Sequence, residues 1–212
     1  HTVIYGRAMH EAVSKYFQFK MAGKSLTLAD LLEAFRLNFD PQGFLDEKHQ
    51  EERSRKGREA LIKFFNEEEK GNSKPQFIEK EFSFIFEDNK ITGRFDRVDI
   101  EEDRAVIMDF KTSEIKTQKD ADKRVKDSLQ LCLYALAYQN IFGSLPKCLK
   151  LYFLEAGIIG TSEIGQEGLE KIKDKIREVS AGIRRQNFAA TPTYMACTYC
   201  AYNQICPYAT VK

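Results

Sequence analysis

The feature that most constrains the fold is an apolar, strand-like segment that ends in charged residues. Residues 105–111 read AVIMDFK. A run this apolar is typical of a central strand that is covered on both faces. Charged side chains are rarely buried without a partner or a function, so Asp109 and Lys111 require an explanation. The preceding segment, 91–100, is also strand-like, and the two are joined by a short turn.

Periodicity divides the rest of the chain into helices and strands. Apolar residues at three- and four-residue spacing predict helices over residues 3–20, about 28–35, 46–70, 120–141 and 167–186. Alternation predicts strands over residues 77–86, 91–100, 105–111, 148–155 and 158–164. The first three strands are expected to form an antiparallel meander. This order predicts a mixed α/β domain with helices packed on a central sheet.

Composition limits the class of protein. The chain has 212 residues, of which 42% are hydrophobic and 31% charged, as expected for one sizeable globular domain. No apolar run reaches the roughly 20 residues that span a bilayer, and the first helix is too charged for a signal peptide. We therefore expect no membrane partner. The net charge of +1 argues weakly against a nucleic-acid binder, so phosphate contacts would have to come from local clusters.

Two acids and a lysine form the central pattern. Residues 93–99 read GRFDRVD and residues 108–113 read MDFKTS. Asp96 and Asp109 lie on neighbouring strands, and Lys111 shares a strand face with Asp109 because side chains alternate. Such a set can bind Mg²⁺ or Mn²⁺, activate water and balance the charge on a phosphate. The alternative is that these residues form an ordinary solvated strand face.

These motifs, taken in order, resemble the RecB-type branch of the PD-(D/E)XK nucleases, notably the nuclease domains of AddB and of UvrD-like helicases. The matching segments are GRAMH at 6–10, the acidic strand at 79–82, GRFDRVD at 93–99, DFKT at 109–112 and QLCLY at 130–134. The chain has no proline before the first aspartate, as is common in this branch. The resemblance implies a restriction-endonuclease-like α/β core with a central mixed sheet flanked by helices. It also implies a single domain over 1–212, comprising a helical region (1–75), a catalytic core (76–187) and a cysteine-rich tail (188–212).

The resemblance also implies roles for individual residues at a metal centre. His10, Asp96 and Asp109 would ligate Mg²⁺ or Mn²⁺, with the carbonyl of Phe110 as a further ligand. Lys111 would be the catalytic lysine. From the residues alone, His10 lies on an apolar helix face, which more often holds a buried core histidine. Attack by water in line with the leaving oxygen would leave a 5′-phosphate and a 3′-hydroxyl.

Further polar residues would complete the site. Gln130 and Tyr134 would contact DNA or support the site. Either Glu79 or Glu81 would add a carboxylate, and the choice stays open because both fall on one strand face. A local basic cluster at the start of the predicted helix over 120–141 is suited to phosphates but diluted by acids: Lys116, Lys119, Lys123, Arg124 and Lys126.

Three of the five cysteines gather near the end of the chain. Cys197, Cys200 and Cys206 form a C-x-x-C-x5-C pattern, which commonly binds a metal or an iron–sulfur cluster. Free cysteines are the alternative. In AddB-like relatives this tail and one upstream cysteine hold a [4Fe–4S] cluster. No cysteine precedes His10, so the fourth ligand would lie outside this sequence, and zinc is the alternative occupant.

The resemblance implies a DNA exonuclease in recombination or repair, joined to a helicase domain or subunit and acting in the cytoplasm. The chain starts without Met, with a helix under way, so we expect it to be part of a longer polypeptide. One rival is a stand-alone exonuclease of the CRISPR-adaptation type. Another is a catalytically silent nuclease fold that binds DNA or docks a subunit. A cysteine-based redox or zinc module would leave the central motifs unexplained.

Overall fold

The computed structural model describes residues 2–42, 44, 46–71 and 75–211. It divides into two compact units, residues 1–172 and 173–212. The first unit contains β1 (Pro75–Phe86), β2 (Asn89–Glu101), β3 (Arg104–Lys111), β4 (Cys148–Phe153) and β5 (Ile158–Ser162). Its helices are α1 (Thr2–Met21), α2 (Leu28–Asn38), α3 (Glu47–Lys70), α4 (Gln118–Lys126) and α5 (Leu129–Phe142). Helix α6 (Gln166–Arg184) runs from the first unit into the second, which also contains α7 (Tyr194–Thr198).

The five strands form one mixed sheet in the order β1-β2-β3-β4-β5. Neighbouring strands are antiparallel except for β3 and β4, which are parallel and are connected through α4 and α5. In this pair Asp109 lies opposite Leu151, and Lys111 lies opposite Phe153. The predicted antiparallel meander and the restriction-endonuclease-like fold class are therefore confirmed.

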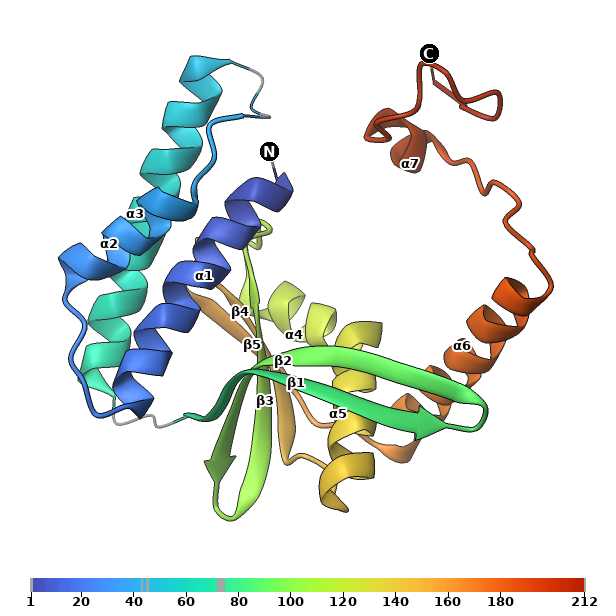
Figure 1. Ribbon diagram of the computed structural model, residues 1–212, viewed down its shortest axis with the longest axis horizontal. Coiled ribbons are helices and arrows are strands. Elements are labelled where there is room, and N and C mark those ends of the chain that lie inside the picture. Colours follow the sequence, from blue (N-terminus) through green and yellow to red (C-terminus); the bar gives the residue numbers. More distant parts are fainter. Residues whose placement is uncertain (1, 43, 45, 72–74, 212) are drawn as a thin grey trace. The chain divides into compact units, whose positions relative to one another are not determined.

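Helices cover both faces of the sheet (Figure 1). On one face, α1, α2 and α3 form a core with residues of β3 and β4. Phe17 of α1 stacks on Phe110 of β3, with ring centroids 6.2 Å apart. On the other face, Tyr134 of α5 meets Phe95 of β2 edge-to-face at 5.4 Å. The residues of β3 from Ala105 to Phe110 are all buried, as the apolar sequence of this strand predicts.

A buried arginine links α1 and α3 to β2. Arg97 is 2% exposed, and its Nε donates to both carboxylate oxygens of Asp99, at 2.9 and 3.0 Å. Its Nη1 lies 3.5 Å from Glu68, and its guanidinium lies over the ring of Phe17, 4.3 Å from the centroid. A charge this deeply buried is tolerated only because carboxylates surround it.

The prediction of one helix over 120–141 is wrong, because the chain breaks at Asp127–Ser128 into α4 and α5. The hydroxyl of Ser128 accepts a hydrogen bond from the amide of Leu131 at 3.2 Å and caps α5. Serine at such a position satisfies an amide that would otherwise lack a partner, so it favours a new helix start. The short helix α7 was also not predicted. None of the described helices is long and apolar enough to cross a lipid bilayer.

Candidate active site

The C-terminal end of β3 carries the acid and lysine that the sequence singles out. Asp109 is 1% exposed, whereas the Lys111 side chain is one-third exposed. Their side chains lie on the same face of β3, and Lys111 Nζ forms an ion pair with Asp109 Oδ2 at 2.7 Å. The apolar residues around them anchor β3 in the core, so the pair is held on a rigid element.

Gln130 holds this pair in place from the first turn of α5. Its Oε1 accepts a hydrogen bond from Lys111 Nζ at 2.8 Å. Its Nε2 donates to Asp109 Oδ1 at 2.7 Å and to the hydroxyl of Tyr134 at 2.8 Å. The predicted residues Gln130 and Tyr134 are therefore adjacent to the acid–lysine pair. The start of α5 at Leu129 is what directs Gln130 toward β3.

Asp96 enters the site where β2 separates from β3. The pairing of the two strands ends at Arg97 and Met108. Beyond this point the amide of Phe110 donates to Asp96 Oδ2 at 3.0 Å. This hydrogen bond to the main chain fixes the position of the carboxylate against β3.

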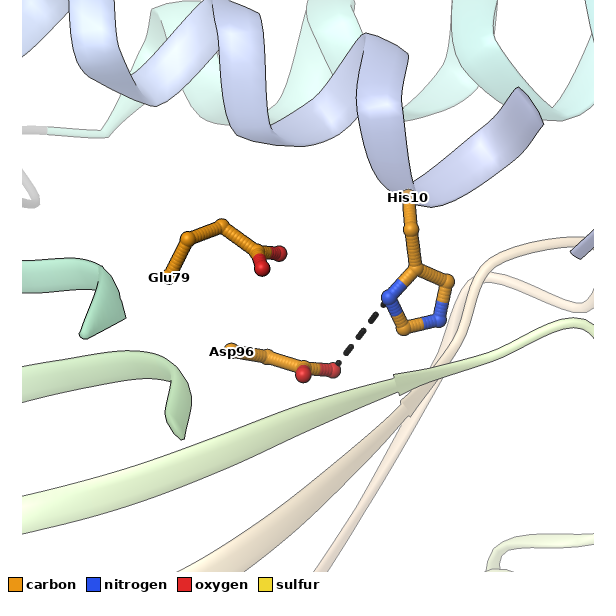
Figure 2. A group of neighbouring side chains, drawn as sticks. All are labelled: His10, Glu79 and Asp96. Atoms are coloured by element: carbon orange, nitrogen blue, oxygen red, sulfur yellow. Dashed lines mark ion pairs between the residues drawn. The ribbon is translucent and has the colours of Figure 1, made fainter. Parts of the chain in front are cut away.

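His10 reaches the same point from α1. Its Nε2 lies 2.8 Å from the carbonyl oxygen of Phe110, which can only accept, so Nε2 is the donor. Figure 2 shows that the other ring nitrogen, Nδ1, faces Asp96, and Nδ1 lies 3.4 Å from Asp96 Oδ2. A neutral imidazole that donates from Nε2 keeps the lone pair on Nδ1, which is the form that binds a metal.

Glu79 completes this group, and Glu81 does not. Ligand atoms of His10, Glu79 and Asp96 all lie within 4.8 Å of one another, and Figure 2 shows both carboxylates on the side of the imidazole. Glu79 has a left-handed backbone with φ 51° inside β1, a conformation that costs a non-glycine residue free energy. Glu81 is exposed. Of the two acids left open by the sequence, the geometry groups Glu79 with the predicted ligands.

Arg94 is a site residue that the sequence reasoning missed. Its Nε lies 2.7 Å from Glu79 Oε2, so it restrains the carboxylate from the neighbouring strand β2. The available signal was its position directly across from the acidic strand, since Arg94 pairs with Glu81 in the register of β1 and β2. A basic residue on one strand that lies opposite acids on the neighbouring strand is a predictable ion-pair partner for them.

The site concentrates negative charge in a partly buried place. Burial, followed by the nearby charge of Asp96, raises the pKa of Asp109 to about 6. The same two causes raise the pKa of Glu79, and burial followed by the charge of Asp109 raises the pKa of Tyr134. Each of these shifts disfavours a further negative charge. A bound cation would relieve this repulsion.

The residues present fit a divalent metal ion. They offer carboxylate oxygens and one imidazole nitrogen, the donors that suit Mg²⁺ or Mn²⁺. Oδ2 of Asp109 is buried and accepts no hydrogen bond of good geometry, although Lys111 Nζ is near. The carbonyl of Phe110, implied as a ligand by the resemblance, accepts from His10 instead. Its second lone pair still leaves it a candidate ligand.

The three predicted cluster ligands lie in the second unit. Cys197 is buried, Cys200 is exposed and Cys206 is intermediate, and all are free thiols. Within the described residues, ligand atoms of His10, Glu79 and Asp96 lie within 4.8 Å of one another, and no group of three cysteine sulfurs does. An iron–sulfur cluster, with zinc as the alternative occupant, remains a prediction.

The chain is similar to known proteins to different degrees. The family model described as "PD-(D/E)XK nuclease superfamily" matches residues 1–207. No curated protein matches the sequence. One solved structure, "Crystal structure of SSO0001", is similar with a TM-score of 0.46 and 16% identity, over 96% of this chain and 82% of that chain. This last likeness is too distant to bear on function.

Proposed function

Because the chain belongs to the PD-(D/E)XK nuclease superfamily, we propose that it is a metal-dependent deoxyribonuclease. The observation that carries the proposal is the meeting of two sets of residues. His10, Glu79 and Asp96 offer ligand atoms within 4.8 Å of one another, and Asp109 pairs with Lys111 at the end of β3. This is the combination of hard ligands and a nearby ammonium that phosphodiester hydrolysis requires.

We assign metal binding to His10, Glu79, Asp96 and Asp109. Bound Mg²⁺ or Mn²⁺ would supply Lewis-acid activation of the phosphate and of the attacking water. The Nε2 hydrogen bond to the main chain fixes the ring so that Nδ1 would be the ligand atom, as is usual for ligating histidines. The four side chains come from α1, β1, β2 and β3, so the site assembles only when these elements are in place.

Lys111 is the proposed catalytic lysine. Its ammonium is partly exposed and is held by Asp109 and by Gln130, which leaves it directed at the mouth of the site. There it stabilises negative charge that develops on the phosphate. In the hydrolysis a water oxygen bonds to phosphorus as the bond from phosphorus to the 3′ oxygen breaks, and a proton goes to the leaving oxygen. Gln130 and Tyr134 act as positioning residues for this lysine.

The first test is cleavage of end-labelled single- and double-stranded DNA with Mg²⁺, Mn²⁺ or EDTA. We expect metal-dependent cutting by the wild type and a loss of at least about 100-fold in Lys111→Ala, since electrostatic groups of this kind contribute about 10²–10³ in rate. Lys90→Ala is the matched control, because Lys90 is an exposed lysine of β2. DNA binding without cutting, in either metal, would favour a catalytically silent module.

The same assay can test two further points: whether the enzyme needs a free strand end, and whether it prefers DNA to RNA. We propose an exonuclease acting on DNA, so a closed single-stranded circle should resist digestion while its linear form is degraded. An RNA strand of the same sequence should be cut poorly. Rapid cutting of the circle would refute the exonuclease assignment, and equal cutting of RNA would refute the preference for DNA; neither outcome would touch the nuclease activity itself.

We further propose that the domain works within a helicase–nuclease in recombination or repair in the cytoplasm. The support is the resemblance of its motifs to AddB and UvrD-like nuclease domains. The test is to isolate the natural polypeptide or its complex from the source cells and measure ATP-dependent DNA unwinding. A stand-alone protein without a helicase partner would instead favour the exonuclease of the CRISPR-adaptation type.

The cysteine tail is proposed to hold part of a [4Fe–4S] cluster, with a fourth cysteine from outside this sequence. Its support is the C-x-x-C-x5-C pattern of Cys197, Cys200 and Cys206. Anaerobic iron and sulfide analysis of the natural protein tests it directly. Stoichiometric iron and sulfide in the wild type that are lost in Cys200→Ser would support the proposal. A folded wild-type protein that contains no iron would refute it.

A further inference from the structure

A basic pocket adjoins the site and shares Lys111 with it, but its other residues have no role in the chemistry described above. It has a volume of about 750 Å³ and lies between α4, the segment 113–116 and the ends of β3 and β4. We call it the basic pocket and define it by the residues Lys111, Ser113, Lys116, Lys123, Arg124 and Ser128. Its volume is in the range of sites for ligands of drug or nucleotide size, about 300–1,000 Å³.

The lining of the basic pocket carries charges of both signs, with four basic residues and three acidic ones. Three acids, Glu114, Asp120 and Asp127, also line it. Of these, Asp120 accepts a hydrogen bond from the hydroxyl of Thr117 at 2.7 Å, at the start of α4. In the described part of the chain, Lys116 and Lys123 form no ion pair, and both are exposed. An exposed ammonium group without a protein partner is available for a phosphate.

The arginine of the basic pocket is held in place. Arg124 Nη1 donates to the hydroxyl of Ser113 at 3.0 Å, and the guanidinium lies near the ring of Phe153, 5.8 Å from its centroid. An anion that binds here would immobilise little further side-chain freedom, which lowers the cost of binding.

Lys111 connects the basic pocket to the proposed catalytic site. Its side chain lines the pocket and also pairs with Asp109 at 2.7 Å. A nucleic-acid strand carries a phosphate at every nucleotide. When one phosphate lies at Lys111, a neighbouring phosphate of the same strand lies within reach of the pocket.

We infer that the basic pocket binds the phosphate next to the scissile one on the same DNA strand, through Lys116, Lys123 and Arg124. The inference rests on the proposed function, because it names how the substrate of that site is held. It predicts that the pocket contributes to strand binding rather than to the chemical step.

The test measures binding of a fluorescein-labelled single-stranded DNA 12-mer by anisotropy, in EDTA and in Ca²⁺, between 50 and 200 mM salt. Lys116→Gln and Lys123→Gln should each weaken binding by about 3- to 10-fold and lower the salt slope by about 0.7, the value for one phosphate of a single strand. Lys119→Gln and Lys126→Gln are matched controls, since both lysines lie on α4 and neither lines the pocket. They should change the dissociation constant by less than about twofold.

The possible outcomes separate the inference from the proposed function. Equal weakening by all four lysine variants would mean a diffuse positive field and would overturn the inference. It is also overturned if neither pocket variant weakens binding, or if the wild type binds no strand in either buffer. Failure of the proposed function would appear elsewhere, as wild-type protein that binds DNA but does not cut it with Mg²⁺ or Mn²⁺.

Discussion

Replacing Asp109 with asparagine should stabilise the metal-free protein while it removes the metal site. The carboxylate is 1% exposed and lies beside Asp96. Burial and this neighbour raise its pKa to about 6, from about 3.9 in an unfolded chain. The charged form of Asp109 is therefore less favourable in the folded protein than in the unfolded chain. Asparagine has nearly the same shape, keeps an oxygen for Gln130 and carries no charge.

The magnitude follows from the pKa. One pKa unit corresponds to about 1.4 kcal/mol, so the ionised carboxylate costs at most about 3 kcal/mol above pH 6. Relaxation around a buried charge reduces this figure, and we expect a gain of about 1–3 kcal/mol at pH 7.5 for Asp109→Asn. For a chain of this size that gain raises Tm by roughly 3–10 °C.

The pH dependence of unfolding tests the direction of this stability change. A raised folded-state pKa means that the folded protein binds the extra proton between about pH 3.9 and 6, so wild-type stability is lost as pH rises through this window. The gain in Asp109→Asn should therefore be under about 1 kcal/mol near pH 4.5 and reach a plateau above pH 6.5. Differential scanning calorimetry in EDTA across pH 4.5–8 measures it. Asp127→Asn, at an exposed acid, should change stability by less than about 0.5 kcal/mol.

Addition of metal should reverse the order of the two proteins. Saturating Mg²⁺ or Mn²⁺ stabilises a protein that binds it by about 2.7 kcal/mol at 100 times the dissociation constant. We expect this increase in the wild type and little of it in Asp109→Asn. A variant that melts at or below the wild-type temperature at pH 7.5 in EDTA would refute the reasoning. So would a gain that is the same at pH 4.5.

Other substitutions test the ligand set, a close contact and the buried arginine. Glu79→Gln should weaken Mn²⁺ binding by about 10- to 100-fold in calorimetric titration, whereas Glu81→Gln should leave it unchanged; the reverse result would reassign the acid. Gly160→Ala should lower stability by about 1–3 kcal/mol in urea unfolding, because its Cβ would lie 2.5 Å from main-chain atoms of α4. Gly182→Ala, with nothing within 4 Å, should instead gain up to about 1 kcal/mol. Arg97→Met should cost about 3–5 kcal/mol by leaving its buried carboxylate partners uncompensated, and a loss under 1 kcal/mol would count against that account.

Much of the fold was predictable because its strands have distinct patterns. The apolar run at 105–111 identified the central strand, and alternation identified its antiparallel neighbours. The break at Ser128 was missed because the apolar pattern continues across it, while the hydroxyl of Ser128 offers a local cap that periodicity does not register. Helix α7 was missed because five residues are too few to establish a period.

The site was predictable where side chains share a strand face and ambiguous where the backbone departs from a regular strand. Asp109 and Lys111 are two positions apart, so alternation alone places them together. Alternation cannot separate Glu79 from Glu81, since both have the same parity. Glu79 differs from Glu81 in its left-handed backbone, and nothing in the sequence predicts this conformation for a glutamate. His10 required the resemblance, because its helix face is otherwise apolar.

The separation of the proposed ligands along the chain has a consequence for folding. They extend from position 10 to position 109, so an ion that binds all four closes a loop of about one hundred residues. Such closure acts as a reversible cross-link, comparable in principle to a disulfide that opens when the metal leaves. Local opening of α1 would then release the metal before the sheet unfolds. Hydrogen exchange in the amides of α1 should slow markedly with Mn²⁺. The exchange rate of this helix would then report whether metal is bound.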